Sequence, residues 1–215
     1  MKIKNIALVG NPNCGKTSLF NTLTGTRQKV ANYAGVTVER KEGSFNLPSG
    51  DAVRVLDLPG TYSLKPSSLD EEVTRAVCLG ELKGEILPDI FICVVDATNL
   101  SLHLSLVLEV RALNRPMILV LNMMDEVKKR GISIDKDKLS QLLGIPVVEA
   151  VAVKTKGIQD LINQLDQKNL FITPYHSELS HFEQVKQITK QVILNNDSGD
   201  KRTAFLDKIF LHPVF

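Results

Sequence analysis

Short apolar runs alternate with amphipathic stretches along most of the chain. Residues 3–9, 89–96 and 116–121 are mostly apolar, which is typical of strands buried on both faces of a parallel sheet. Other segments place apolar residues three or four positions apart, the spacing of a helix that packs on one side. This alternation predicts an α/β fold in which a mainly parallel sheet is flanked by helices.

One early hairpin interrupts the alternation. Residues 37–45 and 52–56 have strand character and are joined by a turn at 48–51, whereas the polar residues 25–35 suit a mobile loop. With a last short strand at 146–148, the sheet is expected to have six strands. The expected helices cover residues 18–23, 70–82, 100–113, 135–143 and 158–165.

The pattern changes after residue 168. Residues 180–194 and 201–211 have helical spacing, with a polar break and no strand between them. We therefore expect an α/β domain at 1–168 and a small, all-helical appended domain at 169–215.

Composition narrows the class of protein. The 215 residues carry a net charge of +2 and are 43% hydrophobic, which suffices for a buried core and shows no strong positive charge for nucleic acid. The three cysteines, Cys14, Cys78 and Cys93, lack C-x-x-C spacing, which favours a reducing compartment. No apolar stretch approaches the roughly 20 residues that span a bilayer, and no signal peptide precedes the first strand. We expect a soluble, cytoplasmic chain without a nucleic-acid partner.

Residues 10–17 read Gly-Asn-Pro-Asn-Cys-Gly-Lys-Thr and fit the phosphate-loop pattern G-x-x-x-x-G-K-[ST]. The motif lies between a predicted strand and a predicted helix, as its mechanism requires. Gly10 and Gly15 let the backbone wrap around phosphate oxygens, so that N–H groups and the positive end of the helix dipole point at the anion. Lys16 is expected to reach the β- and γ-phosphates, and the Thr17 hydroxyl to bind Mg²⁺. The alternative is an ordinary glycine-containing turn.

Two further segments suit the metal and the γ-phosphate. Residues 57–60 read D-x-x-G and follow a predicted strand, at the edge where α/β sheets bind ligands. The Asp57 carboxylate would hold Mg²⁺ through water, and the Gly60 N–H would contact a γ-phosphate. Thr37, in the predicted mobile loop, would bind Mg²⁺ when triphosphate is present, with Thr26 as a weaker competitor. By itself, D-x-x-G is also a common turn.

Residues 122–125 read Asn-Met-Met-Asp, an N-x-x-D motif directly after a core strand. A carboxylate accepts hydrogen bonds from the N1–H and the exocyclic amine of guanine, whereas adenine has an acceptor at N1 and no amine at C2. Asp125 therefore favours GTP over ATP, and Asn122 would brace the phosphate loop. In the partner segment 151–153, Ala152 can donate its N–H to the guanine carbonyl, but a valine precedes it where a hydroxyl residue is usual. We expect weaker base contacts and faster nucleotide exchange.

The residue after D-x-x-G bears on hydrolysis. Small signalling GTPases place Gln there to orient the attacking water, and this chain has Thr61. Asn13 suggests a substitute, since an amide oxygen in the phosphate loop could help to hold a monovalent cation that neutralises charge between the phosphates. The alternative is that Asn13 only tolerates a tight turn. We expect slow, cation-assisted hydrolysis.

With these motifs the chain resembles the cytoplasmic N-terminal region of the FeoB family of bacterial ferrous-iron transporters. The segments that carry the resemblance are residues 7–21, 32–39, 57–64 and 122–125, of which Asn-Tyr-Ala-Gly-Val-Thr-Val-Glu at 32–39 is the most telling. The resemblance covers the chain to about residue 168, and beyond it only position and the closing segment 211–214 match.

The resemblance implies a GTPase at the cytoplasmic face of the bacterial inner membrane, with a potassium ion held by Asn13. It implies that two switch loops report the nucleotide state to a membrane region, and that a helical domain modulates nucleotide release. The short appendage here puts that last role in doubt, and self-association is left open. Two other functions remain: a soluble ribosome- or RNA-associated GTPase, and a nucleotide-sensing interaction module with negligible turnover.

The predicted site draws on all of these segments. The residues expected to contact GTP or GDP are Gly10, Asn11, Pro12, Asn13, Cys14, Gly15, Lys16, Thr17, Ser18, Gly35, Val36, Thr37, Asp57, Leu58, Pro59, Gly60, Asn122, Met123, Asp125, Val151, Ala152 and Val153. Those expected to act in hydrolysis are Asn13, Lys16, Thr37 and Gly60. The expected Mg²⁺ ligands are Thr17, Thr37 and Asp57, and the expected K⁺ ligand is Asn13.

Overall fold

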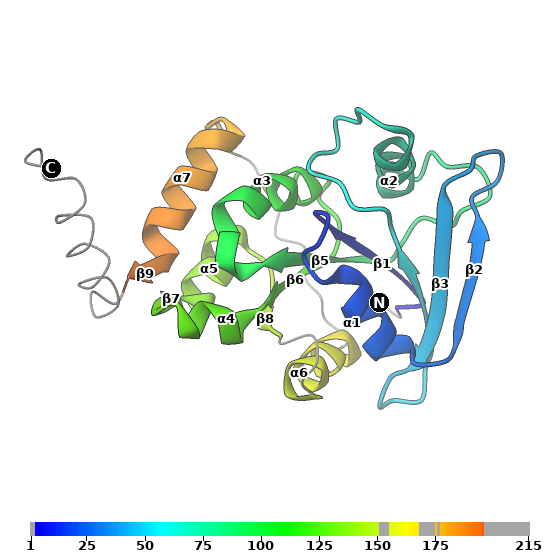
Figure 1. Ribbon diagram of the computed structural model, residues 1–215, viewed down its shortest axis with the longest axis horizontal. Helices are drawn as coiled ribbons and strands as arrows, with labels where there is room; N and C mark the ends of the chain where they lie inside the picture. Colours follow the sequence, from blue (N-terminus) through cyan, green and yellow to red (C-terminus); the bar gives the residue numbers. More distant parts are fainter. Residues whose placement is uncertain (1–2, 151–154, 168–174, 176, 196–215) are drawn as a thin grey trace, which may run out of the picture.

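A computed structural model describes residues 3–150, 155–167, 175 and 177–195 of the chain (Figure 1). The strands are β1 (Asn5–Gly10), β2 (Gln28–Asn32), β3 (Glu39–Asn46), β4 (Ala52–Asp57), β5 (Ile90–Asp96), β6 (Met117–Asn122), β7 (Ile132–Ile134), β8 (Val147–Glu149) and β9 (Ile193–Asn195). The helices are α1 (Lys16–Thr24), α2 (Leu69–Leu79), the 3₁₀ helix η1 (Ala97–Asn99), α3 (Leu100–Arg111), α4 (Met124–Lys129), α5 (Lys136–Leu143), α6 (Thr155–Asp166) and α7 (His181–Val192).

Among the described residues, seven strands form one sheet in the order β2-β3-β4-β1-β5-β6-β8 (Figure 1). The pairs from β4 to β8 are parallel, and β2–β3 and β3–β4 are antiparallel. The mainly parallel α/β fold is confirmed, but the expected number of six strands is wrong. The additional strand is β2, in the segment predicted to be a mobile loop. Its side chains are mostly exposed, so no apolar pattern marks it, and its pairing with β3 makes it a strand.

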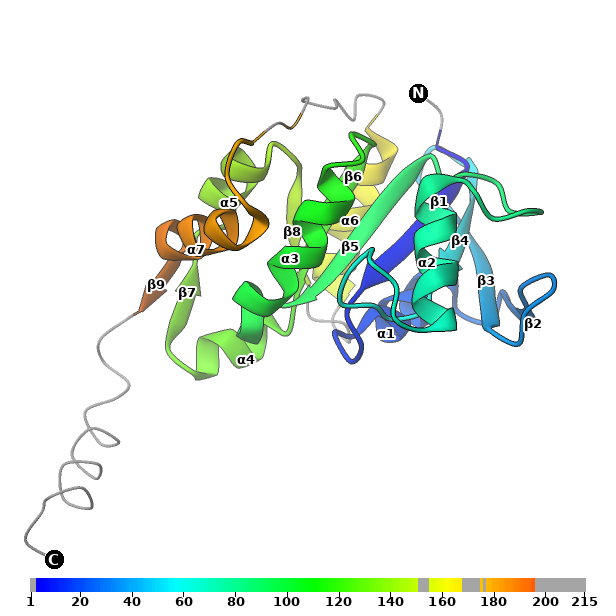
Figure 2. The same cartoon turned by 90° about the horizontal axis from the view of Figure 1, so that it is seen from above.

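Helices cover both faces of the sheet. Phe91 and Cys93 of β5 point into the same buried cluster as residues of α2, α3, α5 and α7. Their neighbours Ile90 and Ile92 point into a second cluster with α1 and α6. Figures 1 and 2 show these two helix layers on opposite sides of the strands. The alternation along β5 explains why this strand is apolar at every position before Asp96, since both of its faces are buried there.

The C-terminal part differs from the expectation of an all-helical appendage. Helix α7 confirms the helix predicted there, and it begins with a capping box between Ser180 and Glu183. The helix ends at Val192, and β9 then pairs antiparallel with β7, so a strand lies where none was expected. Two β-branched isoleucines, one in each strand, face each other at Ile193 and Ile134. The helix predicted at 201–211 lies outside the described residues.

Helix α7 is also packed into the main core. Ile188 and Val192 belong to the cluster that contains Leu104 and Leu108 of α3. The predicted domain boundary at 168 therefore stays a prediction.

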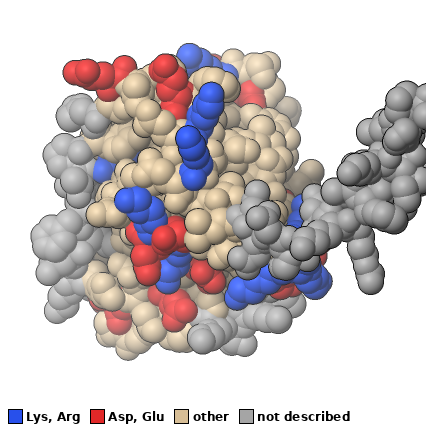
Figure 3. Space-filling view, turned by 90° about the vertical axis from the view of Figure 1, so that its left-hand side faces the viewer, with Lys and Arg blue, Asp and Glu red and all other residues tan. Residues whose placement is uncertain are grey.

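The surface carries charges of both signs. Figure 3 shows Lys and Arg side chains intermingled with Asp and Glu on one end of the molecule, without one continuous basic area on that face. No helix within the described ranges is both long enough and apolar enough to cross a membrane.

Candidate functional site

The phosphate loop connects β1 to α1 and is packed against the end of β6. Gly15, just before α1, has a left-handed backbone with φ 89°, and a Cβ there would lie 2.0 Å from the Asn122 amide nitrogen. That amide donates a hydrogen bond to the Cys14 carbonyl at 2.9 Å. At the start of the loop, a Cβ on Gly10 would lie 2.4 Å from the Val94 carbonyl oxygen. Both glycines are therefore required by close packing. The hydrogen bond from Asn122 stabilises the phosphate loop.

Lys16, Thr17 and Asp57 meet at the N-terminus of α1. The Lys16 ammonium forms an ion pair with Asp57, and both side chains are buried. The Thr17 hydroxyl donates to the other carboxylate oxygen of Asp57 at 3.0 Å. The parallel register of β1 and β4, which sets Leu8 opposite Asp57, brings the two motifs together. A cation, a hydroxyl and a carboxylate thus converge where the helix dipole is positive.

A cavity of about 250 Å³ opens beside this cluster. It is lined by Lys16, Thr17, Val38, Glu39, Lys41, Asp57, Leu58, Pro59, Gly60 and Asp70. The cavity therefore lies between the phosphate loop, residues 38–41 and the D-x-x-G turn. Gly60 lies close to the loop, since a Cβ there would come within 3.0 Å of the Pro12 backbone nitrogen.

Thr37 is not among the residues that line this cavity. It is exposed, beside the buried Val38, and a hydrogen bond from the Tyr33 N–H to the Val38 carbonyl closes the turn around it. Gly35 in this turn has φ 80°, which favours glycine. The predicted residues Gly35, Val36 and Thr37 thus lie in a turn at the edge of the cavity, held through their neighbour Val38.

The sequence did not single out three charged residues of the cavity, Glu39, Lys41 and Asp70. Lys41 stands opposite Asp57 in the pairing of β3 with β4. A hydrogen bond with Glu39 raises the pKa of Lys41. Glu39 and Lys41 are two positions apart on β3, so their side chains lie on the same face of the strand. Only the strand register shows that this face lines the cavity.

The two asparagines of the phosphate loop have different surroundings. Asn13 is exposed and has φ 62°, so its backbone adopts the left-handed conformation that asparagine tolerates. Asn11 is 1% exposed, and neither atom of its amide has a hydrogen-bond partner among the described residues. Next to them, burial raises the pKa of the Cys14 thiol to about 11.

The base-recognition motif follows β6. Met123 has φ 61°, and Asp125 lies in the first turn of α4. Of the predicted partner segment, Val151, Ala152 and Val153 lie outside the described residues.

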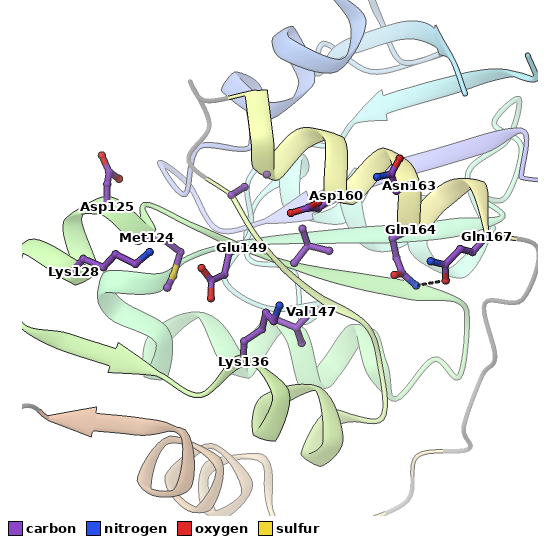
Figure 4. A pocket seen from close by; sticks show the side chains of 13 residues that line it. Met124, Asp125, Lys128, Lys136, Val147, Glu149, Asp160, Asn163, Gln164 and Gln167 are labelled. Carbon is purple, nitrogen blue, oxygen red and sulfur yellow. Dashed lines mark hydrogen bonds between the residues drawn. The ribbon is translucent and has the colours of Figure 1, made fainter. Parts of the chain in front are cut away.

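A larger cavity of about 680 Å³ lies beside the edge strand β8 (Figure 4). Its lining comprises Met124, Asp125, Lys128, Lys136, Val147, Val148, Glu149, Ala150, Gly157, Asp160, Asn163, Gln164 and Gln167. Of the predicted site residues only Asp125 lines it, and Figure 4 shows its carboxylate directed away from Lys136 and Glu149. The phosphate-side cavity is therefore the better candidate for chemistry, although it is smaller.

Thr61 occupies the position directly after D-x-x-G, where small signalling GTPases have the water-orienting Gln, and its side chain points into the protein. Thr61 is fully buried, and its hydroxyl donates to the Ser63 carbonyl at 2.6 Å and lies 3.2 Å from a Glu71 carboxylate oxygen. Its N–H donates to the Gly10 carbonyl. Thr61 thus fastens the D-x-x-G turn to the phosphate loop and is not presented to the cavity.

These features define a class of protein. A phosphate loop after β1, a D-x-x-G turn after β4 and an N-x-x-D turn after β6, on a mainly parallel sheet, make a P-loop G domain. The family model described as ferrous iron transport protein B matches residues 4–165, and the chain belongs to this family, FeoB_N.

Relatives and solved structures agree with this assignment. The Fe(2+) transporter FeoB of Salmonella typhimurium is 46% identical over 188 residues, which cover 86% of this chain and 23% of the relative. The cytosolic domain of L. pneumophila FeoB superposes with a TM-score of 0.81 at 32% identity, covering 89% of this chain and 100% of that one. The cytosolic domain of T. maritima FeoB in its GMPPNP form gives a TM-score of 0.76 at 33% identity, with 89% and 100% covered. The chain thus spans less than a quarter of its curated relatives' length.

Proposed function

We propose that this chain binds GTP and GDP with Mg²⁺, hydrolyses GTP slowly, and reports its nucleotide state to the membrane region of a ferrous-iron transporter. The observation that carries the proposal is the convergence of Lys16, Thr17 and Asp57 at the N-terminus of α1. The T. maritima relative with the same fold has GMPPNP and GDP forms, which supports a guanine nucleotide as the ligand. Family membership favours this function over the ribosome- or RNA-associated alternative, and we expect no nucleic-acid partner.

Each residue of the cluster has a role that its surroundings support. The Lys16 ammonium exchanges its pairing with Asp57 for the β- and γ-phosphates, and the backbone N–H groups of the loop surround the same oxygens. The Gly60 N–H donates to the γ-phosphate. Release of that contact after hydrolysis changes the loop that follows.

The oxygen donors of the cluster suit Mg²⁺. The Thr17 hydroxyl and the Asp57 carboxylate are hard ligands 3.0 Å apart, and Thr37 is the third proposed ligand. When bound, Mg²⁺ neutralises charge on the phosphates. Thr37 contributes only when the turn around it closes on the cavity, so its role depends on the nucleotide state.

Asn13 is proposed to hold a potassium ion. Because Thr61 is buried and bonded within its own turn, it does not take the place of the water-orienting Gln, and a cation that neutralises charge beside the phosphates is the proposed substitute. The Asn13 amide is exposed in the loop, which supports this role. The left-handed backbone at this position also favours asparagine, whether or not a cation binds there. An experiment must therefore distinguish cation binding by the Asn13 amide from this backbone preference.

Guanine selectivity is assigned to Asp125. Val151, Ala152 and Val153 are the proposed partner segment, in which the Ala152 N–H donates to the guanine carbonyl. The transporter's own membrane region, C-terminal to this chain, is the proposed partner, which would place the chain at the cytoplasmic face of the inner membrane. The switch loops are residues 26–40 and 58–70.

The first experiment compares GTP hydrolysis in matched potassium and sodium buffers, with ATP as a control and nucleotide binding measured alongside. The variant Asn13→Gly keeps the left-handed backbone but removes the amide, so it separates the two explanations. We expect faster turnover in potassium for the wild type, and loss of that stimulation with unchanged binding in the variant. Stimulation that survives in Asn13→Gly would assign the cation to other groups.

A nucleotide-sensing module with negligible turnover is the second candidate, and the inward position of Thr61 favours it. Single-turnover hydrolysis distinguishes the two. Tight, guanine-specific binding without measurable phosphate release in potassium would support the second candidate.

A further inference from the structure

Four charged side chains form an ion-pair network where β3, β4 and the segment after α2 meet. Its members are Arg40 and Glu42 of β3, Arg54 of β4, and Glu85 between α2 and β5. Arg40 pairs with both carboxylates, and Arg54 lies 3.1 Å from Glu42 and 2.9 Å from Glu85. The Glu85 side chain is only 9% exposed, so solvent screens its two ion pairs weakly. Glu85 therefore joins the segment after α2 to two strands of the sheet.

The network stabilises the charged forms of its members. Partial burial opposes the ionisation of Glu42, but hydrogen bonds from Arg54 and Arg40 outweigh it and hold the pKa of Glu42 below its usual range. Burial is likewise outweighed at Arg40, whose pKa is raised by hydrogen bonds with Glu85 and Glu42. Removal of one carboxylate would therefore leave a partly buried guanidinium with fewer partners.

Arg40 lies directly behind the phosphate-side cavity. It stands between Glu39 and Lys41, the two residues of β3 that line the cavity. Side chains alternate along a strand, so Arg40 and the network lie on the opposite face of β3. Thr37, the proposed Mg²⁺ ligand, precedes Arg40 by three residues. The contact that fixes Arg40 therefore also fixes the start of β3, from which the turn with Thr37 extends.

The turn 33–38 has a buried base beside the same network. The Tyr33 N–H donates to the Val38 carbonyl at 3.0 Å, and both side chains are buried, whereas Thr37 is exposed. The Tyr33 hydroxyl has no hydrogen-bond partner among the described residues. Burial raises the pKa of this hydroxyl, and the nearby negative charge of Glu85 raises it further. Glu85 thus lies close to both ends of the turn, to Tyr33 directly and to Val38 through Arg40.

We propose that Glu85 is a positioning residue for Thr37. Through Arg40 it holds the start of β3 and the base of the turn 33–38, so that Thr37 reaches Mg²⁺ by a movement of the turn alone. Without the Glu85 carboxylate, Arg40 keeps only its ion pair with Glu42, which lies within β3 and ties it to no other element. The inference rests on the proposed function, because Thr37 is a Mg²⁺ ligand only in that proposal.

The test measures the affinity of the whole chain for GDP and for a non-hydrolysable GTP analogue, each with and without Mg²⁺. Glu85→Gln keeps the size of the side chain and one acceptor oxygen but removes the charge. It should reduce the gain in analogue affinity on adding Mg²⁺ by about threefold or more, while GDP affinity in Mg²⁺ stays within about twofold of the wild type. The two nucleotides differ because Thr37 is proposed to bind the metal only in the triphosphate state.

Two further variants sharpen this comparison. Glu85→Asp retains the charge and should recover part of the gain that Mg²⁺ gives. The matched control Glu81→Gln removes an exposed ion pair with Arg75 from the same segment and should leave the gain unchanged.

A double-mutant cycle with Thr37→Ala distinguishes positioning from a purely structural role. If Glu85 acts through Thr37, Glu85→Gln should reduce the gain no further in the Thr37→Ala background. Urea unfolding of the same variants records any loss of stability. A Glu85→Gln variant that is less stable but keeps the full gain, or that loses it equally with and without Thr37, would overturn the inference alone. Thr37→Ala without effect would remove Thr37 from the metal site, and a wild type that binds no guanine nucleotide would refute the proposed function as a whole.

Discussion

The packing of the phosphate loop against Asn122 leads to a quantitative prediction. Gly15→Ala adds a Cβ where φ is 89° and where the Asn122 amide nitrogen would be 2.0 Å away. Gly50→Ala, in the turn between β3 and β4, is the matched control, because φ is 87° there and no atom lies within 4 Å of the added Cβ. The two variants share the backbone strain and differ in the clash.

The magnitudes follow from these two contributions. A left-handed backbone costs an alanine about 1–2 kcal/mol, so Gly50→Ala should lower the free energy of unfolding by that amount. In Gly15→Ala the amide must also move and give up its hydrogen bond to the Cys14 carbonyl. Leaving a buried donor and acceptor unpaired costs about 1–3 kcal/mol more. Gly15→Ala should therefore exceed its control by about 1–3 kcal/mol.

Urea unfolding followed by circular dichroism measures both differences, provided that the denaturant slope is unchanged. Repeating the pair in an Asn122→Ala background removes the clashing amide, and Gly15→Ala should then cost no more than Gly50→Ala. Equal costs in the native background would refute the packing argument. An excess that persists without Asn122 would place the clash elsewhere.

Three further predictions concern the site. Lys16→Ala removes the phosphate-binding ammonium, and GTP affinity by calorimetry should fall about 10- to 100-fold; unchanged affinity would remove Lys16 from the site. Asp125→Asn replaces one acceptor oxygen by a donor, so the preference for GTP over ATP should fall at least about tenfold. Competition binding measures this preference, and retained discrimination against ATP would place base recognition elsewhere. Cys14 is fully buried, and burial raises the pKa of its thiol to about 11, so both the access of a maleimide and the thiolate fraction at pH 8 are lower than in the unfolded chain. Maleimide should therefore label Cys14 at least roughly 100-fold more slowly at pH 8 in the folded chain than in urea, and equal rates would contradict the buried thiol.

Much of the fold was accessible from local patterns. The core strands β1, β5 and β6 are apolar at nearly every position because both of their faces are buried, and this signal needs no knowledge of partners. By contrast, β2 is polar and exposed, and β9 continues directly from a helix. Both are strands only because they pair with β3 and β7, and pairing is a contact between distant segments.

The same division holds for the candidate site. The phosphate loop, D-x-x-G and N-x-x-D are contiguous motifs whose residue types follow from backbone wrapping, oxygen ligands and base hydrogen bonds, so the sequence alone determined which residues to examine. It could not determine that Lys41 faces Asp57, because this depends on strand register.

Nor could the sequence show that Thr61 is turned inward, or that Glu109 reaches Ser63 from 46 positions away. By itself, the sequence determined the local chemistry and the order of the core elements. Only the tertiary structure decided the strand pairing, the lining of the cavity and the contact between Glu109 and Ser63, because these depend on long-range packing that a linear pattern does not record.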